Sequence, residues 1–139
     1  MPTSDFSDQE PLVSRKEPLR VLIVEDEAII SMELEMLLED LKAEVVGIAM
    51  TAAEAEALVA QHRPDCVTMD INIQGDRDGV AAAHDIFERY GVRSIFVSAY
   101  SDAATRKRAE TANPLGWVKK PVDIEELDLI LRQVKSPGS

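Results

Sequence analysis

Short apolar runs recur along the chain at regular intervals. The first, "LRVLIV" at residues 19–24, is a nearly continuous apolar segment of the length of a strand. Such runs are typical of strands that are buried on both faces of a parallel sheet. The same pattern predicts four further strands, at residues 43–50, 65–69, 93–98 and 114–118.

The segments between these runs carry apolar residues at helical spacing. Thr51 and Glu54 form a capping-box pair, which predicts a helix from there to about Gln61. Residues 101–113 form the weakest predicted helix, because they carry Ala where the other helices carry Leu or Ile. Apolar residues three and four positions apart mark the other three helices: Ile30, Leu34, Leu37, Leu38 and Leu41; Val80, Ala83 and Phe87; and Ile124, Leu127, Leu131 and Val134.

Five strands that alternate with five helices predict an α/β fold with a doubly wound parallel sheet. We expect one domain over residues 19–135, flanked by a flexible N-terminal tail at 1–18 and a flexible end at 136–139, since both ends are rich in polar residues and proline. In such sheets ligands bind at the carboxyl ends of the strands. The search for a functional site therefore starts there.

The composition narrows the class of protein. A formal net charge of −11 over 139 residues argues against nucleic acid or an anionic membrane as the main partner, because phosphates would be repelled. The sequence contains neither an apolar stretch long enough to span a bilayer nor a signal-peptide core. A single cysteine, Cys66, fits a reducing compartment. We therefore expect a soluble cytoplasmic domain.

Polar residues stand at the carboxyl ends of four predicted strands. They are Glu25 and Asp26, Asp70, Ser98, and Lys120 followed by Pro121. Clustered carboxylates suit Mg²⁺, which prefers carboxylate, water and phosphate oxygens. A carboxylate can also accept a phosphoryl group, and phosphoryl transfer needs chiefly positioning and neutralisation of the phosphoryl oxygens. A metal ion could neutralise one phosphoryl oxygen and the Lys120 ammonium a second, while the Ser98 hydroxyl could donate a hydrogen bond to the third.

The consecutive acids Glu25, Asp26 and Glu27 raise a question of charge. Like charges about 4 Å apart repel by on the order of 1 kcal/mol in water, and by more when partly buried. A cation bound by both Glu25 and Asp26 would offset the repulsion between them. Glu27 is better explained as an acid at the start of a helix, where the macrodipole favours it.

Four motifs in order resemble the receiver domain of bacterial two-component response regulators: "VLIVEDE", "PDCVTMDIN", "IFVSAYSD" and "GWVKKP". The resemblance covers nearly the whole predicted domain. It implies a flavodoxin-like sheet of strand order 2-1-3-4-5, with Asp70 as the phosphoacceptor. It also implies Mg²⁺ held by Glu25, Asp26, Asp70 and the backbone carbonyl of Asn72.

The resemblance assigns roles to further residues. Ser98 corresponds to the switch hydroxyl, Trp117 to the switch aromatic, and Lys120 to the conserved lysine, which is usually joined to its proline by a cis bond. Tyr100 lies where the family tunes the access of water to the phosphoryl group. This chain departs from the pattern at Glu25, where an aspartate is usual, and at Gln74, where many receivers carry proline.

The resemblance implies a stand-alone receiver similar to single-domain chemotaxis regulators. A sensor histidine kinase or phosphotransfer protein would phosphorylate Asp70. The surface of the fourth helix, fifth strand and fifth helix would then contact an unknown downstream protein, or the phosphoryl group would pass onward. The sequence runs out after the fifth predicted helix, so we expect no separate output domain. Monomer and phosphorylation-linked dimer stay open.

Other interpretations were weighed against this one. A haloacid-dehalogenase-type phosphatase uses similar residues but places an acid two positions after its nucleophile, where this chain has Asn72. A flavin-binding module would be disfavoured by the acids after the first strand. A receiver-like binding module that acts without phosphorylation stays possible. Taken singly, Asp70 could cap a loop, Lys120 could be a surface lysine, Ser98 could be structural, and Arg106, Lys107 and Arg108 could form a solvated helix face.

Overall fold

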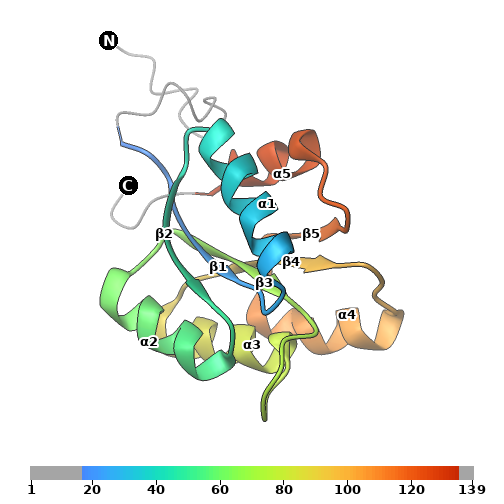
Figure 1. Cartoon of the computed structure of the whole chain (residues 1–139). Coiled ribbons are helices and arrows are strands. Elements are labelled where there is room, and N and C mark those ends of the chain that lie inside the picture. The colour runs from blue at the N-terminus through green and yellow to red at the C-terminus, as the bar shows by residue number, and fades with distance from the viewer. Residues whose placement is uncertain (1–16, 135–139) are drawn as a thin grey trace, which may run out of the picture.

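A computed structural model describes residues 17–134 (Figure 1). No helix in the described part is long and apolar enough to cross a membrane. The strands are β1 (Arg20–Val24), β2 (Glu44–Ala49), β3 (Cys66–Asp70), β4 (Ser94–Ser98) and β5 (Gly116–Lys119). The helices are α1 (Ala28–Asp40), α2 (Ala52–His62), α3 (Gly79–Tyr90), α4 (Ala103–Ala109), the 3₁₀ turn η3 (Glu110–Ala112) and α5 (Ile124–Leu131).

The five strands form one parallel sheet in the order β2-β1-β3-β4-β5. This confirms the predicted fold class and strand order. Every carboxyl end therefore lies at the same edge of the sheet. β1 and β3 are neighbours in the centre, with β4 next to β3 and β5 at the edge, so residues that follow these four strands are brought close together.

The strands are covered on both faces, as their apolar sequences predicted. Successive side chains alternate between the faces: Leu22 and Val24 pack with α2, α3 and α4, whereas Val21 and Ile23 pack with α1 and α5. Figure 1 shows the same division, with α1 and α5 on one side of the sheet and the other helices opposite. The core therefore has two layers, one on each face.

Four of the five described α-helices begin at a capping side chain, and one of these caps, Thr51, was predicted from the sequence. The Thr51 hydroxyl accepts a hydrogen bond from the Glu54 N–H at 3.2 Å. The carboxylates of Asp78, Asp102 and Asp123 cap α3, α4 and α5 in the same way. The single helix predicted at residues 101–113 is in fact a seven-residue α4 followed by a 3₁₀ turn.

Gly79 allows α3 to start against the strand that carries Asp70. A Cβ atom added at Gly79 would lie 2.1 Å from the backbone oxygen of Asp70, well inside any real contact. The Gly79 N–H donates to the carbonyl of Ile71 at 2.8 Å. The absence of a side chain thus lets the helix and the strand end approach closely.

The predicted flexible segments stay predictions. Residues 1–16 and 135–139 lie outside the described part of the chain, so the tail at 1–18 and the end at 136–139 fall almost wholly outside it. Leu19 and Val134, near the two limits of the described chain, are both buried in the core beside α1 and α5.

Candidate functional site

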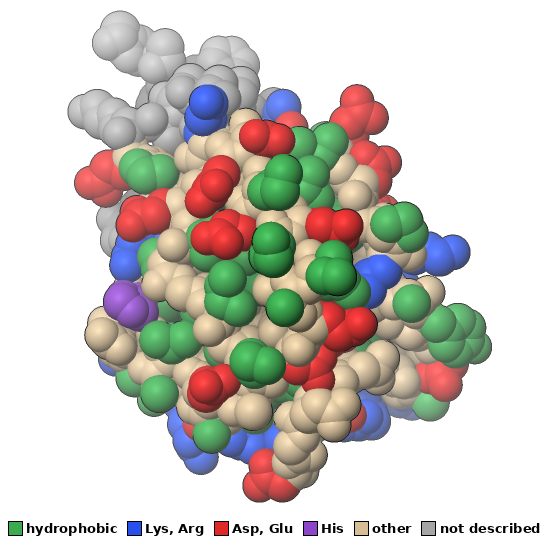
Figure 2. All heavy atoms as spheres, viewed as in Figure 1, with side chains coloured by type: hydrophobic (Ala, Val, Ile, Leu, Met, Phe, Trp, Pro, Cys, Tyr) green, Lys and Arg blue, Asp and Glu red, His purple; other side chains and the backbone are tan. Residues whose placement is uncertain are grey.

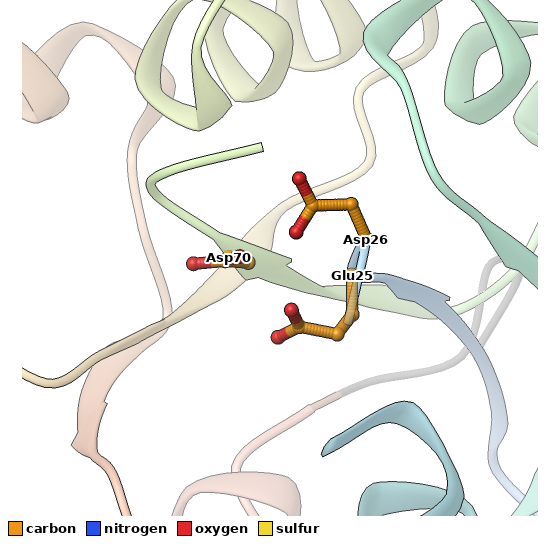
Figure 3. Close-up of side chains that lie close together, drawn as sticks. All are labelled: Glu25, Asp26 and Asp70. Carbon is orange, nitrogen blue, oxygen red and sulfur yellow. The ribbon is translucent and has the colours of Figure 1, made fainter. Parts of the chain in front are cut away.

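Three carboxylates converge at the edge where β1 and β3 end. Glu25 and Asp26 directly follow β1, and Asp70 is the last residue of β3. One carboxylate oxygen from each of the three lies within 4.8 Å of the others. Figure 3 shows the three side chains lying close together, with Glu25 and Asp26 at the end of β1 and Asp70 on β3. The structure thus brings Asp70 next to two acids that lie 44 and 45 positions before it in the sequence, as the strand order requires.

Glu25 is the most deeply buried of the three acids, with 1% of its surface exposed. Its Oε2 accepts a hydrogen bond from the Glu27 N–H at 3.1 Å, and its Oε1 lies 3.2 Å from the Lys120 ammonium. Burial, reinforced by repulsion from Asp70, raises the pKa of Glu25 from 4.5 to about 7, against the opposing effects of Glu27 and Lys120. Without a bound metal, ionisation of the buried Glu25 carboxylate near neutral pH therefore costs free energy.

Lys120 places the positive charge of the site. Its Nζ lies 3.2 Å from Glu25 Oε1, 3.5 Å from Asp70 Oδ1 and 4.0 Å from Glu27 Oε1. Burial opposes the lysine charge, but the carboxylates of Asp70 and Glu25 outweigh it, so the pKa of Lys120 is raised above its usual value. The bond from Lys120 to Pro121 is cis, as predicted.

The loop between β3 and α3 closes over the acids. The Asn72 N–H donates to Asp70 Oδ1 at 3.1 Å, and the Gln74 N–H donates to Asp26 Oδ2 at 3.0 Å. Each of the three carboxylates is therefore bound by a backbone N–H. Such bonds favour the ionised form and orient the oxygens.

A pocket of about 760 Å³ opens over the acids. Asp70, Asp26, Asn72 and Lys120 line it, as the sequence predicted. The other residues that line the pocket were not predicted to do so from the sequence: Glu27, Ile30, Met50, Thr51, Gln74 and Ala99. Met50 and Thr51 directly follow β2, so the rule that pointed to the other strand ends would also have found them.

Ser98 lies beside this pocket, and its hydroxyl is engaged elsewhere. The hydroxyl donates to the Tyr100 carbonyl at 2.5 Å and accepts from the Tyr100 N–H at 3.1 Å. Ala99 contributes to the pocket over Asp70, whereas Ser98 lines a second cavity of about 280 Å³ with Trp117 and Arg106. We expected Ser98 to face the same small volume as Asp70; the local turn at Tyr100 directs it away. The Tyr100 side chain itself is exposed.

Trp117 is half-buried and held between two groups. Its ring stacks on Phe96 with the centroids 4.7 Å apart, and the Arg106 guanidinium lies 4.4 Å from its centroid on a cation–π contact. Arg108 pairs with both oxygens of Asp78, at 3.1 and 3.2 Å. Arg106 and Arg108 lie on an exposed helix face, as the interpretation of a solvated surface expects, and each also contacts a specific partner.

The donor set fits Mg²⁺. Three carboxylates offer one oxygen each at a separation that a single ion can bridge, and hard oxygen ligands are those that Mg²⁺ prefers. Glu25 Oε1 is buried and, in the described part of the chain, faces only the Lys120 ammonium at 3.2 Å, so it has room for a second cationic partner. The pocket above leaves room for water and for a phosphate oxygen.

A family model for the response regulator receiver domain matches residues 21–132, which is most of the chain. The chain belongs to this family. The predicted resemblance is confirmed, and with it membership of a class of two-component signalling proteins. The predicted domain limits of 19–135 lie two and three residues outside the matched segment.

Two curated proteins that this receiver domain resembles are named as regulators. It is 37% identical over 110 residues to the transcriptional regulatory protein PdtaR of Mycobacterium tuberculosis, covering 79% of this chain and 53% of the relative. It is 32% identical over 115 residues to the phyllosphere-induced regulator PhyR of Methylorubrum extorquens, covering 81% and 42%. The chain thus spans about half the length of these relatives.

Solved receiver structures share the fold. The signal receiver domain of a modulated diguanylate cyclase from Desulfovibrio desulfuricans is 32% identical, with a TM-score of 0.78 over 83% of this chain and 91% of the other. The receiver domain of Erythrobacter litoralis PhyR is also 32% identical, with a TM-score of 0.71 over 88% and 96%. The fold is therefore that of isolated receiver domains.

Proposed function

We propose that this receiver domain is a phosphorylation switch in which Asp70 accepts a phosphoryl group in a Mg²⁺-dependent reaction. The observation that carries the proposal is the position of the Lys120 ammonium, 3.5 Å from Asp70 and 3.2 Å from Glu25, beside three convergent carboxylates. An isolated surface aspartate would have no need of a partly buried cation and two further acids beside it.

In the proposed reaction an Asp70 oxygen attacks the phosphorus of a phosphohistidine. A P–O bond forms, giving an acyl phosphate, as the P–N bond breaks, and the leaving imidazole nitrogen takes up a proton from solvent. Glu25, Asp26 and the Asn72 carbonyl would hold Mg²⁺, which supplies positive charge to a phosphoryl oxygen when bound. Lys120 neutralises a second oxygen. The Ser98 hydroxyl reaches a third only after leaving its bonds to Tyr100, which makes its reorientation part of the switch.

The proposed output lies at α4, β5 and α5. Ser98, Arg106 and Trp117 line one cavity there, so a movement of the Ser98 hydroxyl toward Asp70 would change the surroundings of the indole. Tyr100 would lose both of its hydrogen bonds to the Ser98 hydroxyl in this movement, which frees the start of the segment that leads to α4. This face would contact a downstream protein, unless the phosphoryl group passes onward. Phosphorylation-linked dimerisation is a further possible readout of the same movement.

The donor would be a sensor histidine kinase or a phosphotransfer protein in the cytoplasm. Ile29, Met32 and Met36 are exposed on α1 at 73%, 60% and 63%, one helical turn apart. Figure 2 shows this face, where hydrophobic side chains gather among acidic ones. α1 begins two residues after Asp26, so a protein on this stripe would reach the pocket. Flexible Met side chains suit adaptable protein contacts.

The first test is intact mass after incubation with acetyl phosphate, with and without Mg²⁺, on wild type and Asp70→Asn. We expect a Mg²⁺-dependent gain of one phosphoryl group in the wild type alone. A gain that persists in Asp70→Asn would place the acceptor elsewhere. If neither acetyl phosphate nor a phosphorylated histidine kinase labels the wild type, the domain is a binding module that acts without phosphorylation.

A second test separates the donor surface from the chemistry. Met36→Glu should slow transfer from a protein donor by about tenfold, since it puts a charge into an apolar contact, and should leave the rate with acetyl phosphate unchanged. Glu33→Gln, on the same helix, is the matched surface control. An equal loss with both donors would show that the substitution had damaged the site itself.

A further inference from the structure

Asp26 is held differently from the other two acids. Glu25 and Asp70 both contact the Lys120 ammonium and are almost fully buried. Asp26 is only half-buried, and in the described part of the chain its carboxylate is bound by a single hydrogen bond, from the Gln74 N–H at 3.0 Å. The orientation of Asp26 therefore depends on this one backbone group, 48 residues away in the sequence.

The segment that carries this N–H is anchored on both sides of Gln74. Ile73 is buried in the core with 5% of its surface exposed. Gly75 turns the chain with a φ of +115°, and Arg77 then pairs with Glu56 on α2 and Asp85 on α3. Because packing and ion pairs position the loop, the Gln74 amide is placed before any ligand arrives.

An N–H bond to one oxygen leaves the other oxygen of the carboxylate for a cation. Figure 3 shows one Asp26 oxygen directed toward the space between Asp70 and Glu25, and the other directed away from it. Groups that hydrogen-bond a metal ligand fix its orientation and account for a large share of the affinity. The Gln74 side chain is exposed, so only its backbone takes part. Proline, which many receivers carry at this position, has no N–H to donate.

We propose that the backbone N–H of Gln74 is a positioning group for the divalent cation site, which it serves by orienting Asp26. The inference deepens the proposed function and rests on its metal site. In this chain the role belongs to the backbone, so the side chain at position 74 is free to vary among residues that keep the N–H. The same bond makes the loop after β3 a direct contact of the metal site.

The test measures Mg²⁺ binding itself, by calorimetric titration with MgCl₂, on four proteins: wild type, Gln74→Ala, Gln74→Pro, and an alanine variant whose residue-74 amide is replaced by an ester. Gln74→Ala keeps the N–H and should bind as the wild type does. Gln74→Pro and the ester both lack the N–H and should bind Mg²⁺ about tenfold more weakly. Proline could weaken Mg²⁺ binding by distorting the loop, whereas the ester keeps the loop conformation and removes only the N–H. Weak binding by the ester would therefore assign the effect to the lost hydrogen bond.

Equal affinity of the ester and Gln74→Ala would overturn the inference, even if Gln74→Pro binds weakly. A weak Gln74→Ala would overturn it too, because it would assign the effect to the side chain. If the wild type binds no Mg²⁺ at all, the metal site of the proposed function fails instead. Thermal unfolding in EDTA checks that each variant is folded before its affinity is compared.

Discussion

Glu25→Gln should stabilise the metal-free protein at pH 8. In the wild type this carboxylate is 1% exposed and lies beside Asp70, and its pKa is raised from 4.5 to about 7. The native state therefore binds more protons than the unfolded state between these two values. The stability contributed by Glu25 should be fully present below about pH 4.5 and be lost as pH rises to about 7, because the buried group must then ionise.

The size of the effect follows from the shift. At 1.36 kcal/mol per pKa unit, the wild type should lose roughly 2 to 3 kcal/mol of unfolding free energy between pH 5 and pH 8. Glutamine keeps an acceptor for the Glu27 N–H and carries no charge, so this pH dependence should be largely removed. Because the Lys120 ion pair is also weakened, the net gain at pH 8 should be about 1 to 2 kcal/mol.

Urea unfolding in EDTA at pH 5 and pH 8, followed by the fluorescence of Trp117, measures both quantities. Glu27→Gln is the matched control, since the Glu27 side chain is 66% exposed and should change little. Addition of Mg²⁺ at pH 8 should make the wild type more stable than Glu25→Gln. The cation binds an ionised Glu25 carboxylate more tightly than a neutral glutamine amide, so it stabilises the native wild type more.

Two results would refute this reasoning. Glu25→Gln could leave the stability at pH 8 equal to or below that of the wild type, which would mean that the Lys120 contact outweighs the burial of the charge. Alternatively, the variant could keep the full pH dependence between 5 and 8, which would assign the titration to another group.

Three further outcomes are expected. Lys120→Met should lower the rate of phosphorylation by about 10²-fold, because it removes the charge that faces a phosphoryl oxygen; acetyl phosphate kinetics measure it, and an unchanged rate would remove this lysine from the reaction. Gly79→Ala should destabilise by about 1 to 3 kcal/mol in urea unfolding, since its Cβ would lie 2.1 Å from backbone, whereas Gly47→Ala, at 3.4 Å from side chains, should be much milder. Arg106→Ala should shift the emission of Trp117 and cost about 0.5 to 1 kcal/mol; an unshifted spectrum would argue against the cation–π contact.

The sequence alone determined the elements, their order and the strand ends that carry the acids. Apolar runs such as residues 19–24 and the cap at Thr51 are local signals, because burial on both faces and helix capping each leave a pattern within a few residues. The parallel topology then brings Glu25, Asp70 and Lys120 to one edge, as we predicted. Family motifs added the cis bond before Pro121, which the structure contains.

Only the tertiary structure decided how the side chains pair. The two hydrogen bonds of Ser98 to Tyr100, the position of Arg106 over Trp117 and the bond from Gln74 to Asp26 leave no trace in composition or periodicity. The reason is physical: these contacts join loops and helix ends whose relative positions follow from packing of the whole core. A sequence pattern predicts whether a side chain faces the core or the solvent. Which side chain it contacts across the site depends on distances between segments that are fixed only when the whole chain has folded.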